Sequence, residues 1–133
     1  MRSTKVLDSH ALLAYFQGER GAEKIEQIFL EAEEEGQKAL LCLVNWGEVY
    51  YIVKRRKGES YAEQIINAIS RMAIEIIPAD RELTKLAAQF KASHPMSYAD
   101  CFAAALTKLN KADLVTGDRE FKFVEKEINI IWI

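Results

Sequence analysis

Five acidic side chains stand where predicted strands end or where a helix leads back into a strand: Asp8, Glu48, Asp80, Asp100 and Asp118. In an open parallel sheet, ligands bind beyond the carboxyl ends of the strands, so acids at these ends share one edge. Asp100 reaches this edge if the helix that it begins starts there. Neighbouring carboxylates repel one another unless a cation lies among them, and hard oxygen ligands favour Mg²⁺ or Mn²⁺.

Each acid also has a purely structural interpretation as a helix cap. Three of them stand at expected N-cap positions, where aspartate is a preferred residue: Asp8, Asp80 and Asp118. The spacings from Asn45 to Glu48 and from Ser97 to Asp100 fit the capping box, in which two side chains satisfy the first turn of a helix. The two interpretations are compatible, because Glu48 and Asp100 can cap a helix and still present an oxygen outward.

The elements that must position these acids follow from the apolar pattern, which predicts strands at residues 5–7, 39–44, 74–77, 112–116 and 128–133. Helical periodicity and stop signals predict helices at residues 10–16 and 22–35. Further helices are expected after the N-caps Asn45, Ser60, Asp80, Ser97 and Asp118. Strands that alternate with helices predict an α/β domain with a mostly parallel sheet and right-handed crossovers.

The composition bounds the class of protein. The chain has 133 residues, which predicts one domain, residues 1–133, that is long enough to bury a core. Its 18 Lys and Arg against 20 Asp and Glu give a formal charge of −2, which neither indicates nor excludes nucleic-acid binding. We expect a cytoplasmic protein without membrane contact, since we see neither a signal peptide nor an apolar run of about 20 residues.

The cysteines and histidines do not form a metal-ligand pattern. Cys42 and Cys101 lack paired spacing and are expected to be reduced thiols in the core. His10 lies on a predicted helix and His94 precedes a proline, and neither has the partners that a zinc site needs. We interpret both histidines as surface or local structural residues, which leaves the acids as the side chains best suited to chemistry.

Four short motifs occur in order along essentially the whole chain. They are Val6-Leu7-Asp8-Ser9, Asn45-Trp46-Gly47-Glu48-Val49, Met96-Ser97-Tyr98-Ala99-Asp100-Cys101-Phe102-Ala103-Ala104-Ala105 and Thr116-Gly117-Asp118-Arg119-Glu120-Phe121. With these motifs the sequence resembles PIN-domain ribonucleases, and most closely VapC-type toxins of toxin–antitoxin pairs. The chain departs from the pattern at Glu120, where many relatives carry an aspartate, which leaves one supporting metal contact open.

The resemblance implies a three-layer domain in which helices flank a five-stranded, mostly parallel sheet of order 3-2-1-4-5. Strands one and four are then neighbours, so that Asp8, Asp100 and Asp118 converge as catalytic and metal-binding acids, with Glu48 nearby. Asp80 follows the outer third strand and is expected to be only a cap, which makes it an internal control. Three further side chains are expected to hold the carboxylates in place: Ser9, Asn45 and Thr116.

The resemblance also implies an activity and partners. A PIN nuclease hydrolyses RNA phosphodiester bonds with Mg²⁺ or Mn²⁺ and leaves a 5′-phosphate and a 3′-hydroxyl. Arg119 and Lys122 lie nearer the expected metal and are candidates for contacting the RNA backbone or for pairing with an acidic neighbour. Residues 54–57 either bind phosphates or end a helix in solvent. VapC-type proteins dimerise through apolar helices and bind a small antitoxin. The apolar residues around 49–52 and 65–69 either form such a dimer surface or simply pack on the sheet.

Other functions stay open at this point. The main alternative is a catalytically silent PIN fold that binds RNA or a partner, and a plain ligand-binding α/β domain follows if the acids do not converge. A haloacid-dehalogenase-type phosphatase also has an aspartate after the first strand, but it needs a second one where His10 stands. Flap-like nucleases share the chemistry but are much longer.

Overall fold

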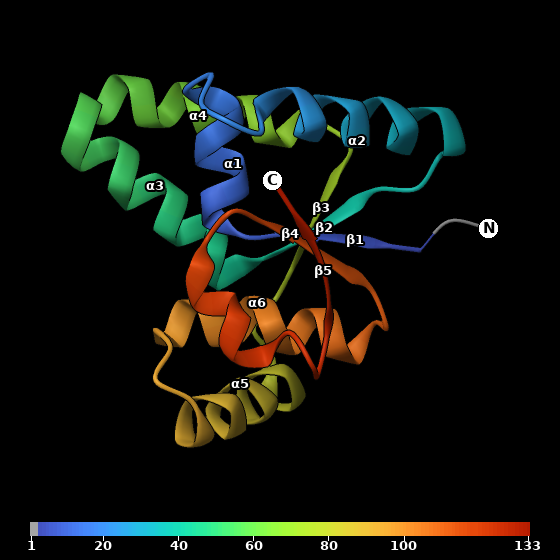
Figure 1. Cartoon of the computed structure of the whole chain (residues 1–133). Coiled ribbons are helices and arrows are strands. Elements are labelled where there is room, and N and C mark those ends of the chain that lie inside the picture. Colours follow the sequence, from blue (N-terminus) through green and yellow to red (C-terminus); the bar gives the residue numbers. More distant parts are fainter. Residues whose placement is uncertain (1–2) are drawn as a thin grey trace.

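The computed structural model describes residues 3–133 and has one five-stranded sheet, in which all neighbouring strands run parallel (Figure 1). The strand order is β3-β2-β1-β4-β5, as the resemblance implies. The strands are β1 (Lys5–Leu7), β2 (Ala39–Cys42), β3 (Ile74–Ile77), β4 (Asp113–Thr116) and β5 (Asn129–Trp132). The two central strands, β1 and β4, therefore lie side by side, although more than 100 residues of sequence separate their paired positions Val6 and Leu114.

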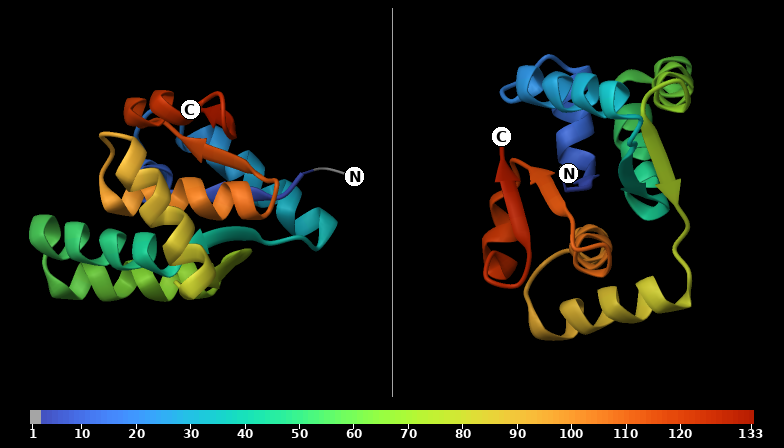
Figure 2. Two further views of the ribbon diagram at one scale, coloured as in Figure 1. Left: turned by 90° about the horizontal axis from the view of Figure 1, so that it is seen from below. Right: turned by 90° about the vertical axis from the view of Figure 1, so that its right-hand side faces the viewer.

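Helices connect the strands and cover both faces of the sheet. They are α1 (Ser9–Phe16), α2 (Ala22–Glu35), α3 (Leu43–Lys57), α4 (Glu59–Ser70), α5 (Arg81–Ser93) and α6 (Tyr98–Leu109), with a 3₁₀ helix η1 (Arg119–Val124) before β5. Figure 2 shows α1, α2 and α4 on one side of the sheet and α5 and α6 on the other. The predicted three-layer α/β architecture is thus confirmed.

The two layers follow from the alternation of side chains along each central strand. Val6 is buried in the core on the α5–α6 side, together with Leu40 and Leu114 from the paired positions of β2 and β4. Leu7, one residue on, is buried in the core on the opposite side of the sheet with Leu41 and Val115. Because both faces of these strands are covered, the strands are apolar throughout, as expected of a parallel sheet between helices.

The structure corrects the predicted start of the helix after the second strand. β2 ends at Cys42 and α3 begins at Leu43, with Cys42 at the N-cap position. Asn45 is therefore not the N-cap but a fully buried residue in the first turn. The apolar run misled the prediction, because a buried strand and a buried helical turn have the same apolar pattern over so short a stretch.

Other boundaries differ less. α4 begins at Glu59 with Gly58 as its N-cap, so Ser60 does not cap it as predicted. α1 begins at Ser9, one residue earlier than expected, with Asp8 as its N-cap. The predicted N-caps Asp80, Ser97 and Asp118 are confirmed, and each accepts a hydrogen bond from a backbone N–H in the helix that follows. Two cysteines are buried and free, as expected: Cys42 and Cys101.

The loop between α1 and α2 is fastened over the end of β5. Gly21 has a positive φ of 95°, and a Cβ atom there would lie 2.8 Å from the Cβ atom of Ile133. A side chain at this position would thus be excluded by both backbone strain and close packing. Lys24 Nζ donates a 3.0 Å hydrogen bond to the carbonyl oxygen of Trp132.

In the described part of the chain, every helix is too short or too polar to cross a membrane.

Candidate active site

Asp8 lies at the carboxyl end of the central strand β1 and is almost completely buried, with 1% of its surface exposed. Its Oδ1 accepts a 2.8 Å hydrogen bond from the backbone N–H of Ala11, which is the capping interaction of α1. Its Oδ2 accepts a 2.5 Å hydrogen bond from the hydroxyl of Thr116, the last residue of β4. Asp8 therefore caps a helix and at the same time joins the ends of two adjacent strands.

Thr116 connects this carboxylate to a second one. Its Oγ1 donates to Asp8 and accepts a 3.0 Å hydrogen bond from the backbone N–H of Asp118. One hydroxyl thus fixes the backbone at Asp118 relative to the Asp8 carboxylate. The side chain of Asp118 caps η1 by accepting a 3.0 Å hydrogen bond from the backbone N–H of Glu120.

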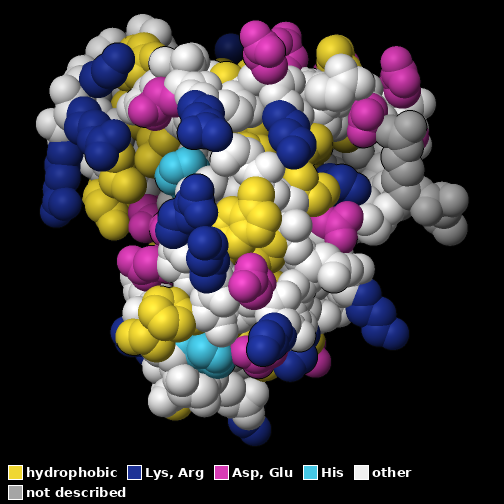
Figure 3. Space-filling view, in the orientation of Figure 1, with side chains coloured by type: hydrophobic (Ala, Val, Ile, Leu, Met, Phe, Trp, Pro, Cys, Tyr) yellow, Lys and Arg dark blue, Asp and Glu magenta, His cyan; other side chains and the backbone are white. Residues whose placement is uncertain are grey.

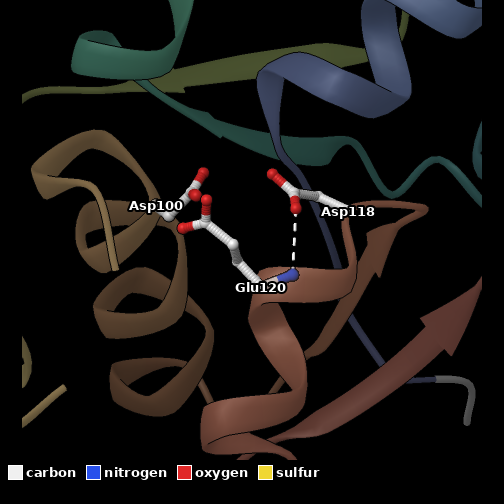
Figure 4. Close-up of side chains that lie close together, drawn as sticks. All are labelled: Asp100, Asp118 and Glu120. Carbon is white, nitrogen blue, oxygen red and sulfur yellow. Dashed lines mark hydrogen bonds between the residues drawn. The ribbon is translucent and has the colours of Figure 1, made fainter. Parts of the chain in front are cut away.

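The first turn of α6 brings a third acid to this edge of the sheet. Ser97 Oγ accepts a 3.2 Å hydrogen bond from the backbone N–H of Asp100, so the helix starts where the sequence analysis required it to. One carboxylate oxygen each from Asp100, Asp118 and Glu120 lie within 4.8 Å of one another. Figure 4 shows the three side chains, from α6 and from the start of η1, turned toward one another.

Glu120 is the residue that sequence reasoning left undecided. The structure places its carboxylate in the group with Asp100 and Asp118, although its side chain is exposed. The available signal was its spacing of two residues from Asp118 at a strand exit, since a tight turn there keeps both side chains at the same edge. An extra methylene group relative to aspartate does not take the carboxylate of Glu120 out of reach.

Glu48 approaches from the first turns of α3 and is held by two neighbours. Ser9 Oγ donates a 2.6 Å hydrogen bond to Glu48 Oε1, and Asn45 Nδ2 lies 3.5 Å from the same oxygen. Asn45 Nδ2 also donates to the carbonyl oxygen of Ala99 at 3.1 Å, so it ties α3 to the start of α6 beside Asp100. Among the described residues, the buried Asn45 Oδ1 has no hydrogen-bond partner. Glu48 lies outside the three-acid group but near enough for its charge to act on Asp100.

Burial and mutual repulsion make two of these acids hard to ionise. Burial raises the pKa of Asp8 from 3.8 to about 7, against the hydrogen bonds from Thr116 and Ala11, and the charges of two neighbouring acids raise it further. Burial also raises the pKa of Asp100 to about 7, followed by the charge of Asp118. The folded chain therefore holds carboxylates close together in surroundings that disfavour their ionised forms.

The residues present fit a divalent cation. Within residues 3–133, none of the acids Asp8, Glu48, Asp100, Asp118 and Glu120 forms an ion pair with a lysine or arginine. All the donor atoms are carboxylate oxygens, which suit Mg²⁺ or Mn²⁺ better than zinc. A cation among them would relieve both the repulsion and the cost of burying charge.

Asp80 shows what a capping acid looks like away from this site. Its Oδ1 accepts a 2.9 Å hydrogen bond from the backbone N–H of Leu83, the same capping interaction that Asp8 makes. Its side chain is exposed, and it follows β3, which is an edge strand. The three-acid group does not include Asp80, in line with its expected role as a cap.

The basic residues considered for RNA binding fall into two sets. Arg119 and Lys122 are exposed on η1, directly after Asp118. The cations at the end of α3 contact its own aromatic side chains and those of α4: Lys54 lies over Tyr50, Arg55 over Tyr51 and Lys57 over Tyr61. Only the first set lies on the element that directly follows one of the acids, Asp118.

Comparisons with known proteins agree with this architecture. A family model described as the PIN domain matches residues 5–127. Among curated proteins, no match to the sequence was found.

Several solved structures have the same fold at low sequence identity. The DNA-bound VapBC from Salmonella typhimurium matches with a TM-score of 0.77 and 15% identity, over 98% of both chains. VapBC2 from Rickettsia felis, bound to a promoter DNA fragment, matches with a TM-score of 0.75 and 15% identity, over 98% of both chains. VapC20 from Mycobacterium tuberculosis, described as a sarcin-ricin loop cleaving toxin, matches with a TM-score of 0.69 and 11% identity, over 94% of this chain and 96% of that one.

Proposed function

From the finding that the chain belongs to the PIN-domain family, we propose that it is a metal-dependent endoribonuclease and the toxin of a toxin–antitoxin pair. The observation that carries the proposal is the convergence of carboxylates from β1, α6 and the β4–η1 junction without a compensating cationic side chain. A site that only stabilised the fold would not need buried acids that oppose one another's ionisation.

The proposed metal ligands are the three grouped acids Asp100, Asp118 and Glu120, together with Asp8 and Glu48. When bound, Mg²⁺ or Mn²⁺ would neutralise charge on the phosphate and lower the pKa of a water molecule. Thr116 and Ala11 hold the carboxylate of Asp8 in a fixed orientation, so its position does not depend on the metal.

Glu48 is the acid best placed to orient the attacking water. Ser9 and Asn45 both engage its Oε1, which leaves its other oxygen to accept a proton. In the proposed reaction the water oxygen bonds to phosphorus and the bond from phosphorus to the 3′ oxygen breaks. The products are a 5′-phosphate and a 3′-hydroxyl, and the leaving oxygen takes up a proton.

Substrate and partners follow from the same proposal. Arg119 and Lys122 would contact the RNA backbone beside the cut, since they follow Asp118 directly on η1. A homodimer through α3 and α4 is supported by apolar surface there, where Tyr51 is 46% exposed. A cognate antitoxin is supported by the VapBC complexes that share the fold. We further propose that residues 1–133 form a single domain and that the protein is located in the cytoplasm.

The test is RNA cleavage by the purified protein with Mg²⁺, with Mn²⁺ and with EDTA, beside the variants Asp100→Asn and Asp80→Asn. We expect cleavage that requires metal, is lost by at least about a hundredfold in Asp100→Asn and is retained in Asp80→Asn. Both variants remove one carboxylate at a helix start, so the pair separates the site from a cap. Metal-independent cleavage, or equal loss in both variants, would contradict the site. Metal binding without cleavage of any RNA would favour the silent binding module.

A further inference from the structure

A pocket of about 250 Å³ adjoins the acids on the side of β5. Two of its lining residues, Gly117 and Arg119, flank Asp118 in the sequence, and His10 lies two residues after Asp8. The remaining lining includes Glu19, Arg20 and Ile133. Figure 3 shows several lysine and arginine side chains, with acidic side chains among them, on the face of the molecule that is seen in Figure 1.

The pocket is built by contacts between distant parts of the chain. The close packing of Gly21 against Ile133, and the bond from Lys24 to the end of β5, hold the α1–α2 loop over the strand. This loop carries Arg20 to the same pocket as Arg119, although 99 residues separate them. The sequence alone gives no sign that these two arginines line one pocket.

Gly117 lies directly against the imidazole ring of His10. A Cβ atom at Gly117 would come within 2.6 Å of the Cε1 atom of His10 and 3.2 Å of its Nδ1. A side chain here would push the imidazole ring away from the backbone at the strand exit. Glycine at this position therefore lets His10, which is exposed on the surface as expected, line the pocket beside the acids.

The side chains that line the pocket carry a net positive charge, from two arginines against one glutamate. Within residues 3–133, neither Arg20 nor Arg119 forms an ion pair. Glu19 is the one acid of the lining, against two guanidinium groups and an imidazole. A guanidinium group presents planar pairs of N–H donors that match the oxygens of a phosphate. The donor set thus suits a phosphate, in contrast to the acids next to it, which suit a cation.

We propose that this pocket binds a backbone phosphate of the RNA next to the one that is cut, through Arg20, Arg119 and His10. The inference rests on the proposed nuclease function, because it is an RNA strand lying at Asp118 that would place a neighbouring phosphate here. It adds two binding residues, Arg20 and His10, that lie outside the four sequence motifs. The RNA strand would then lie across the surface from the acids toward the end of β5.

The experiment measures binding of a short fluorescein-labelled single-stranded RNA by fluorescence anisotropy, over a series of salt concentrations in Mg²⁺. Asp100→Asn serves as the background so that the RNA stays intact. Onto it are placed Arg20→Ala, Arg119→Ala or, as the matched control, Arg71→Ala. Arg71 is an exposed arginine that precedes β3, at the opposite end of the strands. Each substitution on the pocket should weaken binding about tenfold and reduce the slope of log K against log salt by about 0.7, the value of one phosphate contact on a single strand.

The results distinguish failure of this inference from failure of the nuclease proposal. Metal-dependent cleavage by the native chain, with the same affinity and salt slope in Arg20→Ala, Arg119→Ala and Arg71→Ala, would overturn the pocket and leave the nuclease intact. Loss of binding in the pocket variants without cleavage by the native chain would overturn the nuclease and leave the phosphate pocket. An RNA that the native chain does not bind at all overturns the pocket as well. His10→Ala extends the test, since its effect should follow that of Arg20→Ala.

Discussion

Removing the divalent cation and raising the pH should together destabilise the protein, because Asp8 and Asp100 lie in surroundings that oppose their ionisation. Burial is the main cause for both acids, and it raises each pKa from 3.8 to about 7. In the unfolded chain both acids are solvated and ionise near their ordinary pKa. Between these two pKa values the folded chain binds more protons than the unfolded chain, so the free energy of unfolding falls as the pH rises.

The magnitude follows from the width of that interval. Between about pH 5 and pH 8 the pH rises through roughly two units before it reaches the folded pKa of each acid. One such unit lowers the free energy of unfolding by about 1.4 kcal/mol for each acid. Asp8, which is 1% exposed, should therefore contribute a loss of about 3 kcal/mol. Asp100 is 6% exposed and should contribute less, because solvent screens part of its interaction. The loss begins above the unfolded pKa and is complete above the folded one.

The assay is urea unfolding in EDTA at a series of pH values, repeated with Mg²⁺ or Mn²⁺. The proposed cation binds ionised carboxylates, so it should stabilise the protein mainly at the alkaline end and flatten the pH dependence. At a metal concentration about 100 times the dissociation constant the gain is about 3 kcal/mol. At about pH 5, where both acids of the folded chain hold protons, we expect little stabilisation by metal.

Two variants isolate the effect from that of other titrating groups. Asp8→Asn removes one of the two shifted acids and should reduce the fall in stability by more than half, because Asp8 contributes more than Asp100. Asp80→Asn is the matched control, because its amide oxygen can accept the same capping hydrogen bond and the stabilisation by metal should persist. A stability in EDTA that is constant or rises between about pH 5 and pH 8 would contradict this prediction, and so would equal stabilisation by metal at both ends of this range.

Two further substitutions test how the site is supported. Thr116→Val keeps the shape of the side chain but removes the hydroxyl that joins Asp8 to the backbone of Asp118. We expect the free energy of unfolding in urea to fall by about 2 kcal/mol and RNA cleavage to fall as well. An unchanged stability would show that these hydrogen bonds are dispensable. Gly21→Ala places a Cβ atom against Ile133 at a positive φ and should cost more than about 1 kcal/mol; a stability equal to that of the native chain would contradict the packing described for the α1–α2 loop.

The fold was accessible from the sequence because its signals are local and repeated. Short apolar runs separated by helical periodicity predicted the elements, and the four motifs supplied the strand order that periodicity does not contain. Where the prediction failed, as at Asn45, two elements meet without an intervening loop, so the apolar pattern has no break. No turn residue marks the boundary at Cys42, because the chain passes directly from strand to helix.

The site was accessible only in part. The acids could be identified as candidates, but their hydrogen bonds depend on side chains that are distant in sequence. Ser9 holds Glu48 across 39 positions, and Thr116 holds Asp8 across 108. Asn45 was expected to support a carboxylate, and its Nδ2 lies 3.5 Å from Glu48 Oε1; it also donates to the carbonyl oxygen of Ala99, which the sequence did not indicate. The contribution of Glu120 to the group required the geometry of the turn after Asp118.

Helix capping and site formation turn out to be the same interaction in two settings. Asp8 and Asp80 each accept a hydrogen bond from the third backbone N–H that follows, so the capping geometry does not distinguish them. They differ in the strand that each one follows. β1 has a neighbour on both sides, and the end of one of them supplies Thr116 and Asp118, whereas β3 is an edge strand with a single neighbour. In a parallel sheet, capping acids after central strands are thus the ones that other strand ends and helix starts can surround. Asp8 is therefore both buried and repelled by other acids, whereas Asp80 is exposed and lies outside the group; a cation beside Asp8 would stabilise its charge.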